Sequence, residues 1–314
     1  MLSIRSLLPL PLLLLLLAAC SEPPQEAIRL GTNVWPGYEP LYLAQHLDLI
    51  NPDEVRLVEY PSASEVIRAF RNRSLEAAAL TLDEALLLQQ DGIPVSVILV
   101  MDISDGGDVI MARKDVANMV ALKGKRVAVE SGALGAYVIA RALELHGLKL
   151  AEIEVRHLDV SAHEAAYRDG EVDAVVTFEP VRTQLLNQGA HEIFSSREMP
   201  GEIVDVLVVH NAMLEQPQRL QSLVKGWFSA LDHLKNQPQS AAGIIAKRLG
   251  VTPQEALDSY QGLQLPSRQE NQQLLSDSGS LHVTVERLGA TMRENALLRG
   301  EASSKALLFD GMVK

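Results

Sequence analysis

The sequence predicts an α/β protein of two lobes with a helical C-terminal segment. From Ala27 onward, short apolar strands alternate with helices, which is the pattern of parallel β-α units. The series of strands and helices starts again at Lys125, and after Val209 the pattern is helical. We therefore expect two α/β lobes, with the helical end of the chain packed on the first of them.

The first nineteen residues have the pattern of a bacterial lipoprotein signal. Arg5 supplies a positive charge, residues 7–17 form an apolar core, and Leu17-Ala18-Ala19-Cys20 is a small-residue processing site. An uncleaved membrane anchor is disfavoured because the apolar run is shorter than the ~20 residues that a spanning helix needs. Cys20 would carry the lipid, and residues 20–26 would tether the protein to the periplasmic face of a bacterial membrane.

Composition narrows the possible functions. The sequence has 28 Lys and Arg against 40 Asp and Glu, a formal net charge of -12, which argues against a nucleic-acid partner. Cys20 is the only cysteine, so a disulfide scaffold and a cysteine-based metal site are excluded. The eight histidines are scattered and form neither HExxH nor HxH. We expect a monomer with no metal, no cofactor and no catalytic residue.

The first series of elements has clear helix starts. Ser62 and Glu65 have the spacing of a capping box, and Thr81 and Glu84 form a second one. The unbroken apolar run 95–101 is typical of a strand whose sheet is covered on both faces. The expected strands are 28–34, 55–60, 75–80, 95–101 and 109–113, with helices at 41–47, from Ser62 and from Thr81 to Gly92.

The second series repeats the first at an offset of 97 residues. Ala69-Phe-Arg-Asn and Ala166-Tyr-Arg-Asp are separated by this offset, as are Leu75-Glu-Ala-Ala and Val172-Asp-Ala-Val. One offset for several elements favours a two-lobe pseudo-repeat, although unrelated α/β lobes also share such patterning. The expected strands are 126–129, 153–158, 172–178 and 191–194, with helices at 131–145, 161–168 and 180–188.

The last part of the chain begins with one apolar strand, 204–209, and continues with helices. We expect helices at 214–235, 240–249, from Thr252 and at 283–298, with no further strand and with Trp227 in the core. If the strand returns the chain to the first lobe, lobe 1 comprises 27–112 and 205–314, and lobe 2 comprises 113–204.

The expected site lies where strand ends and helix starts face each other across two such lobes. The stretch 31–40 is a strand-to-helix crossover that places Trp35 and Tyr38 in one turn, where packing over a sheet edge is the alternative to a binding role. The 97-residue offset matches it to 128–137, which sets Trp35 across a cleft from Glu130 and Ser131. The candidate ligand-binding residues are Asn33, Trp35, Tyr38, Thr81, Asp83, Asp102, Glu130, Ser131, Thr177 and Glu179.

Acidic residues gather at these strand ends, where the sequence places no Lys or Arg. Helix starts attract acids through caps and the helix dipole, which explains part of the pattern. Glu130 and Asp102 end strands, so that explanation fits them less well. Our hypothesis is that some of these carboxylates pair with a cationic or amine-bearing small molecule, with Trp35 and Tyr38 supplying a face for it.

Several motifs carry a resemblance to a known family. They are the lipobox, the strand 28–32 running into Trp35-Pro-Gly-Tyr-Glu-Pro-Leu-Tyr-Leu-Ala44, Glu76-Ala-Ala-Ala-Leu-Thr81, Leu122-Lys-Gly-Lys-Arg-Val127 and Val172-Asp-Ala-Val-Val-Thr-Phe-Glu-Pro180. In these the chain resembles the substrate-binding lipoproteins of ABC importers, of the type II periplasmic binding protein fold. The nearest branch holds the aliphatic sulfonate, taurine, nitrate and thiamin-precursor binders, and the likeness covers roughly residues 27–210.

The resemblance implies two lobes joined by crossovers near 108–114 and 200–205 that close on a ligand. It implies a lipid-anchored protein that captures a small organic molecule and delivers it to an ABC permease. The alternatives are a module that reports such a ligand to a membrane signalling protein and, less expected, a periplasmic enzyme.

Two departures from the family pattern are visible. Sulfonate and nitrate binders need donors for an oxyanion, which an acidic cleft does not favour. The related eukaryotic pyrimidine-precursor synthases carry a cysteine-rich motif, and a chain whose sole cysteine is Cys20 cannot have it. Enzyme activity of that type is therefore not expected.

Overall fold

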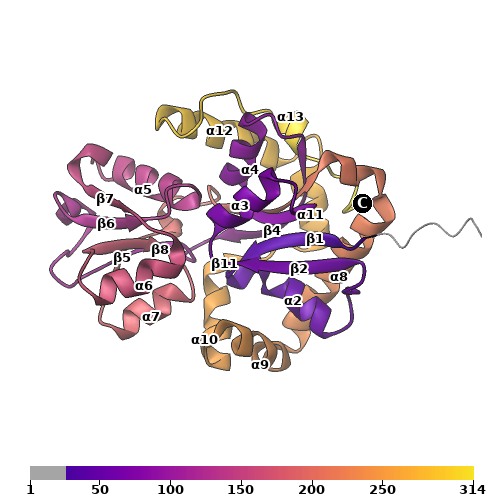
Figure 1. Cartoon of the computed structure of the whole chain (residues 1–314), viewed down its shortest axis with the longest axis horizontal. Coiled ribbons are helices and arrows are strands. Elements are labelled where there is room, and N and C mark those ends of the chain that lie inside the picture. The colour runs from indigo at the N-terminus through magenta and orange to yellow at the C-terminus, as the bar shows by residue number, and fades with distance from the viewer. Residues whose placement is uncertain (1–25) are drawn as a thin grey trace, which may run out of the picture.

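The computed structural model of the protein describes residues 26–314. The predicted signal peptide, the lipid site at Cys20 and nearly all of the tether lie outside the described residues. Two separate sheets, each flanked by helices, form two lobes side by side (Figure 1). This confirms the predicted two-lobe α/β fold.

The sheet of lobe 1 has the strand order β11-β4-β10-β3-β1-β2. β1, β2 and β3 run parallel, whereas β10 runs antiparallel to both β3 and β4. The strands are β1 Ile28–Asn33, β2 Val55–Tyr60, β3 Ala77–Thr81, β4 Val95–Ser104, β10 Val204–His210 and β11 Leu263–Gln264.

The sheet of lobe 2 has the order β7-β6-β8-β5-β9, and β5 runs antiparallel to β8 and β9. Its strands are β5 Val109–Ala112, β6 Arg126–Val129, β7 Glu154–His157, β8 Ala174–Thr177 and β9 His191–Ser195. The two sheets share one strand order, which is β2-β1-β3-β10-β4 in lobe 1 and β7-β6-β8-β5-β9 in lobe 2. In each lobe the fourth strand of this order, β10 or β5, runs antiparallel to its neighbours. The reversed strand of each lobe directly follows the crossover from the other lobe.

Helices cover both faces of each sheet. In lobe 2, α5 lies on one side of the sheet and α6 and α7 on the other; in lobe 1, α4 and α12 lie opposite α2, α8 and α9 (Figure 1). The α-helices are α2 Glu39–His46, α3 Ala63–Arg71, α4 Leu82–Gln90, α5 Leu134–Leu145, α6 Val160–Arg168, α7 Val181–Asn187, α8 Pro217–Asn236, α9 Pro238–Leu249, α10 Pro253–Ser259, α11 Arg268–Leu275, α12 Ser280–Glu294 and α13 Ser304–Leu307. Short 3-10 turns occupy Pro36–Tyr38, Met119–Leu122, Leu150–Glu152, Ser196–Glu198, Asn211–Glu215 and Tyr260–Gly262.

The helical end of the chain packs on lobe 1, as predicted. α8 and α9 contact α2, α12 contacts α4, and α11 and α13 contact β4. Trp227 of α8 is fully buried in this core. The expectation of no further strand is wrong, because Leu263–Gln264 pairs with the edge of β4. Two residues are too few to produce a visible alternation in the sequence.

Several boundaries differ from the sequence expectation. β4 continues to Ser104 because β10 pairs with its end on one side and β11 on the other. α2 begins at Glu39, where Pro40 fits the first helical turn. α5 begins at Leu134 because its N-cap, Ala133, is extended. Each predicted capping box contributes one bond: the Ser62 hydroxyl accepts from the Glu65 amide, and the Glu84 carboxyl accepts from the Thr81 amide.

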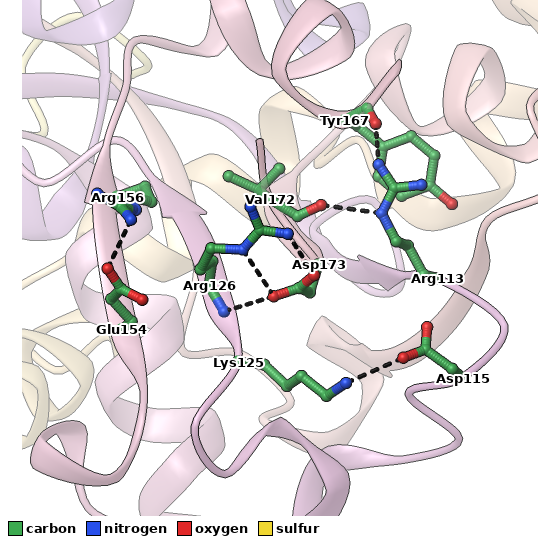
Figure 2. Close-up of polar contacts among 9 residues, drawn as sticks. All are labelled: Arg113, Asp115, Lys125, Arg126, Glu154, Arg156, Tyr167, Val172 and Asp173. Carbon is green, nitrogen blue, oxygen red and sulfur yellow. Dashed lines mark hydrogen bonds and ion pairs between the residues drawn. The ribbon is translucent and has the colours of Figure 1, made fainter. Parts of the chain in front are cut away.

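The 97-residue offset also relates two arginine–acid pairs. In lobe 1, Glu76 accepts from the Arg29 amide at 2.8 Å and from its guanidinium at 2.5 and 3.0 Å. In lobe 2, Asp173 accepts from the Arg126 amide at 2.8 Å and from its guanidinium at 2.7 and 3.1 Å (Figure 2). Each pair joins the starts of the first and third strands, at the end of the sheet away from the cleft.

The lobe 2 pair offers a stability test. Asp173→Ala should lower the free energy of unfolding by about 1 kcal/mol, because three hydrogen bonds to a partly exposed carboxylate are lost. The matched control is Glu154→Ala, which removes the exposed partner of Arg156 seen in the same view (Figure 2) and should change stability by less than about 0.5 kcal/mol. Urea unfolding of both variants measures this, and equal losses would contradict the structural role given to Asp173.

Candidate ligand-binding site

A cavity lies between the lobes at the carboxyl ends of the parallel strands. Its volume is about 40 Å³, well below the ~150 Å³ of an engineered cavity that binds benzene. Its carboxyl groups are those of Glu84, Asp108, Glu130 and Asp205, its aromatic residues are Trp35, Tyr38 and Phe178, and its other polar residues are Asn33, Thr81, His163 and Thr177. An organic solute larger than this space requires the lobes to separate.

The aromatic wall joins the two lobes. The rings of Trp35 from lobe 1 and Phe178 from lobe 2 meet edge to face, with centroids 5.3 Å apart. The Trp35 indole donates to Asp102 at 3.1 Å, and the Tyr38 hydroxyl donates to Asp205 at 2.5 Å. Gly37 makes this turn possible, since a Cβ there would lie 1.9 Å from an Asp102 carboxyl oxygen.

Burial changes the ionisation of the acids at this site. It raises the pKa of Asp102 and of Asp108 to about 7, the pKa of Asp83 to about 6 and the pKa of Glu84 to about 8. The pKa of Asp205 lies well above its ordinary value, first through burial and then through the neighbouring charge of Asp102. The site therefore holds protons near neutral pH that a bound cation would displace.

Four buried polar atoms on the cavity wall have no hydrogen-bond partner. They are Oγ1 of Thr81, Oδ2 of Asp108, Nδ1 of His163 and Oγ1 of Thr177, on side chains that are at most 5% exposed. His163 donates from Nε2 to the Leu158 carbonyl at 3.1 Å, which leaves Nδ1 as an acceptor. Burial lowers the pKa of His163 to about 4, so its ring is neutral at neutral pH. The cavity thus presents acceptors on Asp108 and His163 and two threonine hydroxyl groups that can donate or accept.

Two hydrogen bonds cross the cleft in opposite directions. Glu130 of lobe 2 accepts from the Ser64 amide at 2.8 Å, at the start of α3 in lobe 1. Glu84 of lobe 1 accepts from the Leu134 amide at 3.1 Å, at the start of α5 in lobe 2. Together with the Trp35–Phe178 contact, they hold the lobes against each other.

Six of the ten candidate residues line this cavity: Asn33, Trp35, Tyr38, Thr81, Glu130 and Thr177. The structure places the other four elsewhere. Asp83 and Asp102 are buried outside the lining, where Asp102 accepts from Trp35. Ser131 is exposed and lies 2.5 Å from Nδ1 of His157, and Glu179 forms an ion pair with Arg182. These four side chains are engaged within the protein.

Arginines pair with two of the acids near the strand ends. Arg248 of α9 pairs with Glu39 at 2.9 Å and lies over the Tyr42 ring at 3.4 Å. Arg182 pairs with Glu179 at 3.1 Å, three residues further along the chain. Glu39 and Glu179 therefore have partners within the chain, and the hypothesis of a cationic ligand now depends on the carboxyl groups of the cavity.

The sequence analysis did not select Glu84, Asp108, His163, Phe178 or Asp205 as ligand-binding residues. A usable signal existed for two of them, because Asp108 and Asp205 are separated by the same 97-residue offset. Each lies at the start of a reversed strand, β5 or β10, and an antiparallel strand begins at the edge where its parallel neighbours end. Glu84 was interpreted as a helix cap, which it also is.

Within residues 26–314, no group of three or more His, Cys, Asp or Glu side chains is placed to hold a metal ion. Over the same range, none of the helices combines the length and the apolar character that crossing a membrane requires.

Comparison with solved structures identifies the fold. The alkanesulfonate-binding protein SsuA from Xanthomonas axonopodis pv. citri, bound to MOPS, superposes with a TM-score of 0.75 over 92% of this chain and 99% of that one, at 18% identity. The aliphatic sulphonate binding protein SsuA from Escherichia coli gives a TM-score of 0.73 over the same shares, also at 18% identity. The chain therefore has the periplasmic-binding-protein fold.

Sequence relatives agree with this result. A putative aliphatic sulfonates-binding protein of Escherichia coli (strain K12) is 23% identical over 250 residues, 77% of each chain. The taurine-binding periplasmic protein of the same strain is 23% identical over 179 residues, which covers 55% of this chain and 54% of that protein. Both are binding proteins, which supports a solute-binding role. The sequence profile of the NMT1-like family matches residues 21–250, well over half of the chain, and the protein belongs to that family.

Proposed function

We propose that this solute-binding protein captures a small organic cation or amine-bearing molecule between its lobes and delivers it to an ABC importer. One observation carries the choice of ligand class: the residues that line the cavity include Asp108 and His163, each with a buried acceptor that has no partner. Among the described residues, no lysine or arginine lines it. A buried acceptor without a donor is costly, so a ligand rich in N–H groups gains most from this site.

The relatives named above are described as binding sulfonates or taurine. Membership of the same family does not establish that this protein binds those ligands. A sulfonate in this cavity would face the carboxyl groups of Glu84, Asp108, Glu130 and Asp205 without a cationic side chain on the wall. The ionised forms of these carboxyl groups would repel the sulfonate strongly in a low-dielectric cavity. Trp35 and Phe178 would instead offer aromatic surface to a cation.

We propose that the lobes, 27–112 with 205–314 and 113–204, open and close about their two crossovers. Sheet membership agrees with the second boundary, since β9 and β10 lie in different sheets. It moves the first boundary, since β5, Val109–Ala112, lies in the sheet of lobe 2 and the first crossover therefore falls between Ser104 and Val109. The crossovers are bonded to each other through Ser196, whose hydroxyl accepts from the Gly106 amide at 2.6 Å and lies 2.8 Å from the Ser104 hydroxyl. Such a joint allows rotation of the lobes without separating the crossovers.

We further propose that residues 1–19 are a signal peptide and that Cys20 carries a lipid on the periplasmic face of a bacterial membrane. The charged start, the apolar run and the Leu17-Ala18-Ala19-Cys20 site support this. The periplasmic names of the relatives agree with the compartment. The working form would be an anchored monomer, with residues 20–26 as the tether.

Asp108→Asn tests the ligand class. The change keeps the side-chain size and removes an unpartnered carboxyl oxygen, so affinity for a cationic ligand should fall by at least about tenfold. Isothermal titration calorimetry measures this, after a thermal-shift screen of amines, amidines and sulfonates has identified the ligand. The matched control, Asp115→Asn, alters an exposed acid that pairs with Lys125 (Figure 2) and does not line the cavity, so it should leave affinity unchanged. A screen in which only sulfonates bind would contradict the proposal.

The pH dependence of binding has a definite sign. A cation favours the ionised forms of Asp108 and Glu84, whose pKa values are about 7 and about 8, so affinity should rise between pH 6 and pH 8 with release of protons. The free protein should behave oppositely: groups with raised pKa values stabilise the fold while protonated, so its free energy of unfolding should fall over the same range. Calorimetry in buffers of different ionisation enthalpy measures the proton release. Affinity that decreases toward pH 8 would be incompatible with a cationic ligand.

Cys20→Ser tests the lipid anchor. The variant should move from the membrane fraction to the soluble fraction of cells, because the lipidated thiol is lost. Fractionation with immunoblotting measures this, and Ser21→Ala, which keeps the cysteine, is the control. Retention of the Cys20→Ser variant in membranes would rule out lipid anchoring at this residue.

A further inference from the structure

We infer that Glu84 and Glu130 are specificity-determining residues that exclude anionic solutes. Each accepts a hydrogen bond from a backbone amide at a helix N-terminus beside the cavity, the start of α5 for Glu84 and the start of α3 for Glu130. This rests on the proposed function, since it explains why a fold shared with sulfonate binders would select a cation. The inference assigns the two residues a role that neither helix capping nor lobe contact requires.

The first of these helix N-termini is the start of α5 in lobe 2. The free amides of a helix N-terminus favour an anion, and α5 has 12 residues, Leu134–Leu145. Glu84 reaches across from α4 of lobe 1, and its Oε1 accepts from the Leu134 amide at 3.1 Å. Its other oxygen accepts from the Thr81 amide at 2.9 Å, so both oxygens are held in place. An anion entering the cavity meets a carboxyl group where the Leu134 amide would otherwise be free.

The second of these helix N-termini is the start of α3 in lobe 1. Here Glu130, at the end of β6 in lobe 2, accepts from the Ser64 amide at 2.8 Å. A Cβ at Gly132 would lie 2.9 Å from the Ser64 hydroxyl, so the loop that carries Glu130 packs closely on this helix start. Each lobe thus supplies the acid for the helix start of the other lobe.

The hydrogen-bonding state of the other polar groups at the cavity supports this inference. Oδ2 of Asp108 and Nδ1 of His163 are buried, lack partners and accept hydrogen bonds. The amides of Ser64 and Leu134, donors at the two helix starts, already have partners from within the chain. The two glutamates therefore occupy two backbone donors at the cavity, and the unpartnered groups that remain are the acceptors on Asp108 and His163 and the hydroxyl groups of Thr81 and Thr177.

The test is a gain of anion binding. Glu84→Ala frees the Leu134 amide to donate to an anion, so the variant should bind ethanesulfonate at least about tenfold more tightly than the unaltered protein. Glu255→Ala is the matched control, because Glu255 makes the same capping contact, to the Thr252 amide at 2.7 Å, on an exposed helix start of the tail. It should not gain ethanesulfonate binding. Glu130→Ala, which opens the start of α3, is the second variant if Glu84→Ala does not fold.

Titration calorimetry with ethanesulfonate, together with the amine panel used for the unaltered protein, separates the outcomes. Ethanesulfonate binding gained by a cavity variant and not by Glu255→Ala supports the inference. If folded Glu84→Ala and Glu130→Ala both fail to bind ethanesulfonate while the unaltered protein binds an amine, the inference is overturned and the proposed function stands. If the unaltered protein itself binds ethanesulfonate as tightly as the variants, the cation preference fails as well.

Discussion

The direction of two strands fixes where the cavity lies. β5 and β10 each enter a sheet from the other lobe and run against their neighbours. Their starts therefore lie at the edge where the parallel strands end, and each start carries an aspartate, Asp108 or Asp205. Because these strands also continue the two crossovers, the acids stand at the joint between the lobes. Any rotation of one lobe on the other moves the site they form.

Placing carboxyl groups at such a joint has an electrostatic cost. Burial raises the pKa of Asp102 and Asp108 to about 7. Asp102 receives a single hydrogen bond from Trp35, and Asp205 receives one from Tyr38. Elsewhere the chain neutralises buried acids directly, as Arg248 does for Glu39. Glu39 is thus neutralised within the chain, whereas Asp102 and Asp108 have no arginine partner and are partly protonated near neutral pH. Perturbed ionisation combined with a cavity is the usual property of a functional site.

The fold was predictable from the sequence because its signals are local. Apolar runs, capping boxes and the 97-residue offset are read over short windows, and the structure follows them closely: α3 is Ala63–Arg71 and α6 is Val160–Arg168, at that same offset. The site was predictable in part, since residues at the ends of parallel strands, such as Asn33 and Thr177, could be placed by topology alone. The remainder depended on packing between distant segments. Nothing in the sequence places Arg248 beside Glu39, or turns His163 of α6 toward the cavity.

The contacts across the cleft also limit how a ligand can stabilise the closed arrangement of the lobes. A ligand stabilises the closed arrangement only through interactions that it makes better there than in an open one. The bonds from Glu84 and Glu130 to the opposite helix starts belong to the protein and would form whether or not a ligand is present. The ligand's own contribution must come from the groups still unpaired when those bonds are made, which are the acceptors on Asp108 and His163 and the hydroxyl groups of Thr81 and Thr177. Closure and binding are therefore linked: the same two glutamates that hold the lobes together occupy two backbone donors and leave these four groups for the solute.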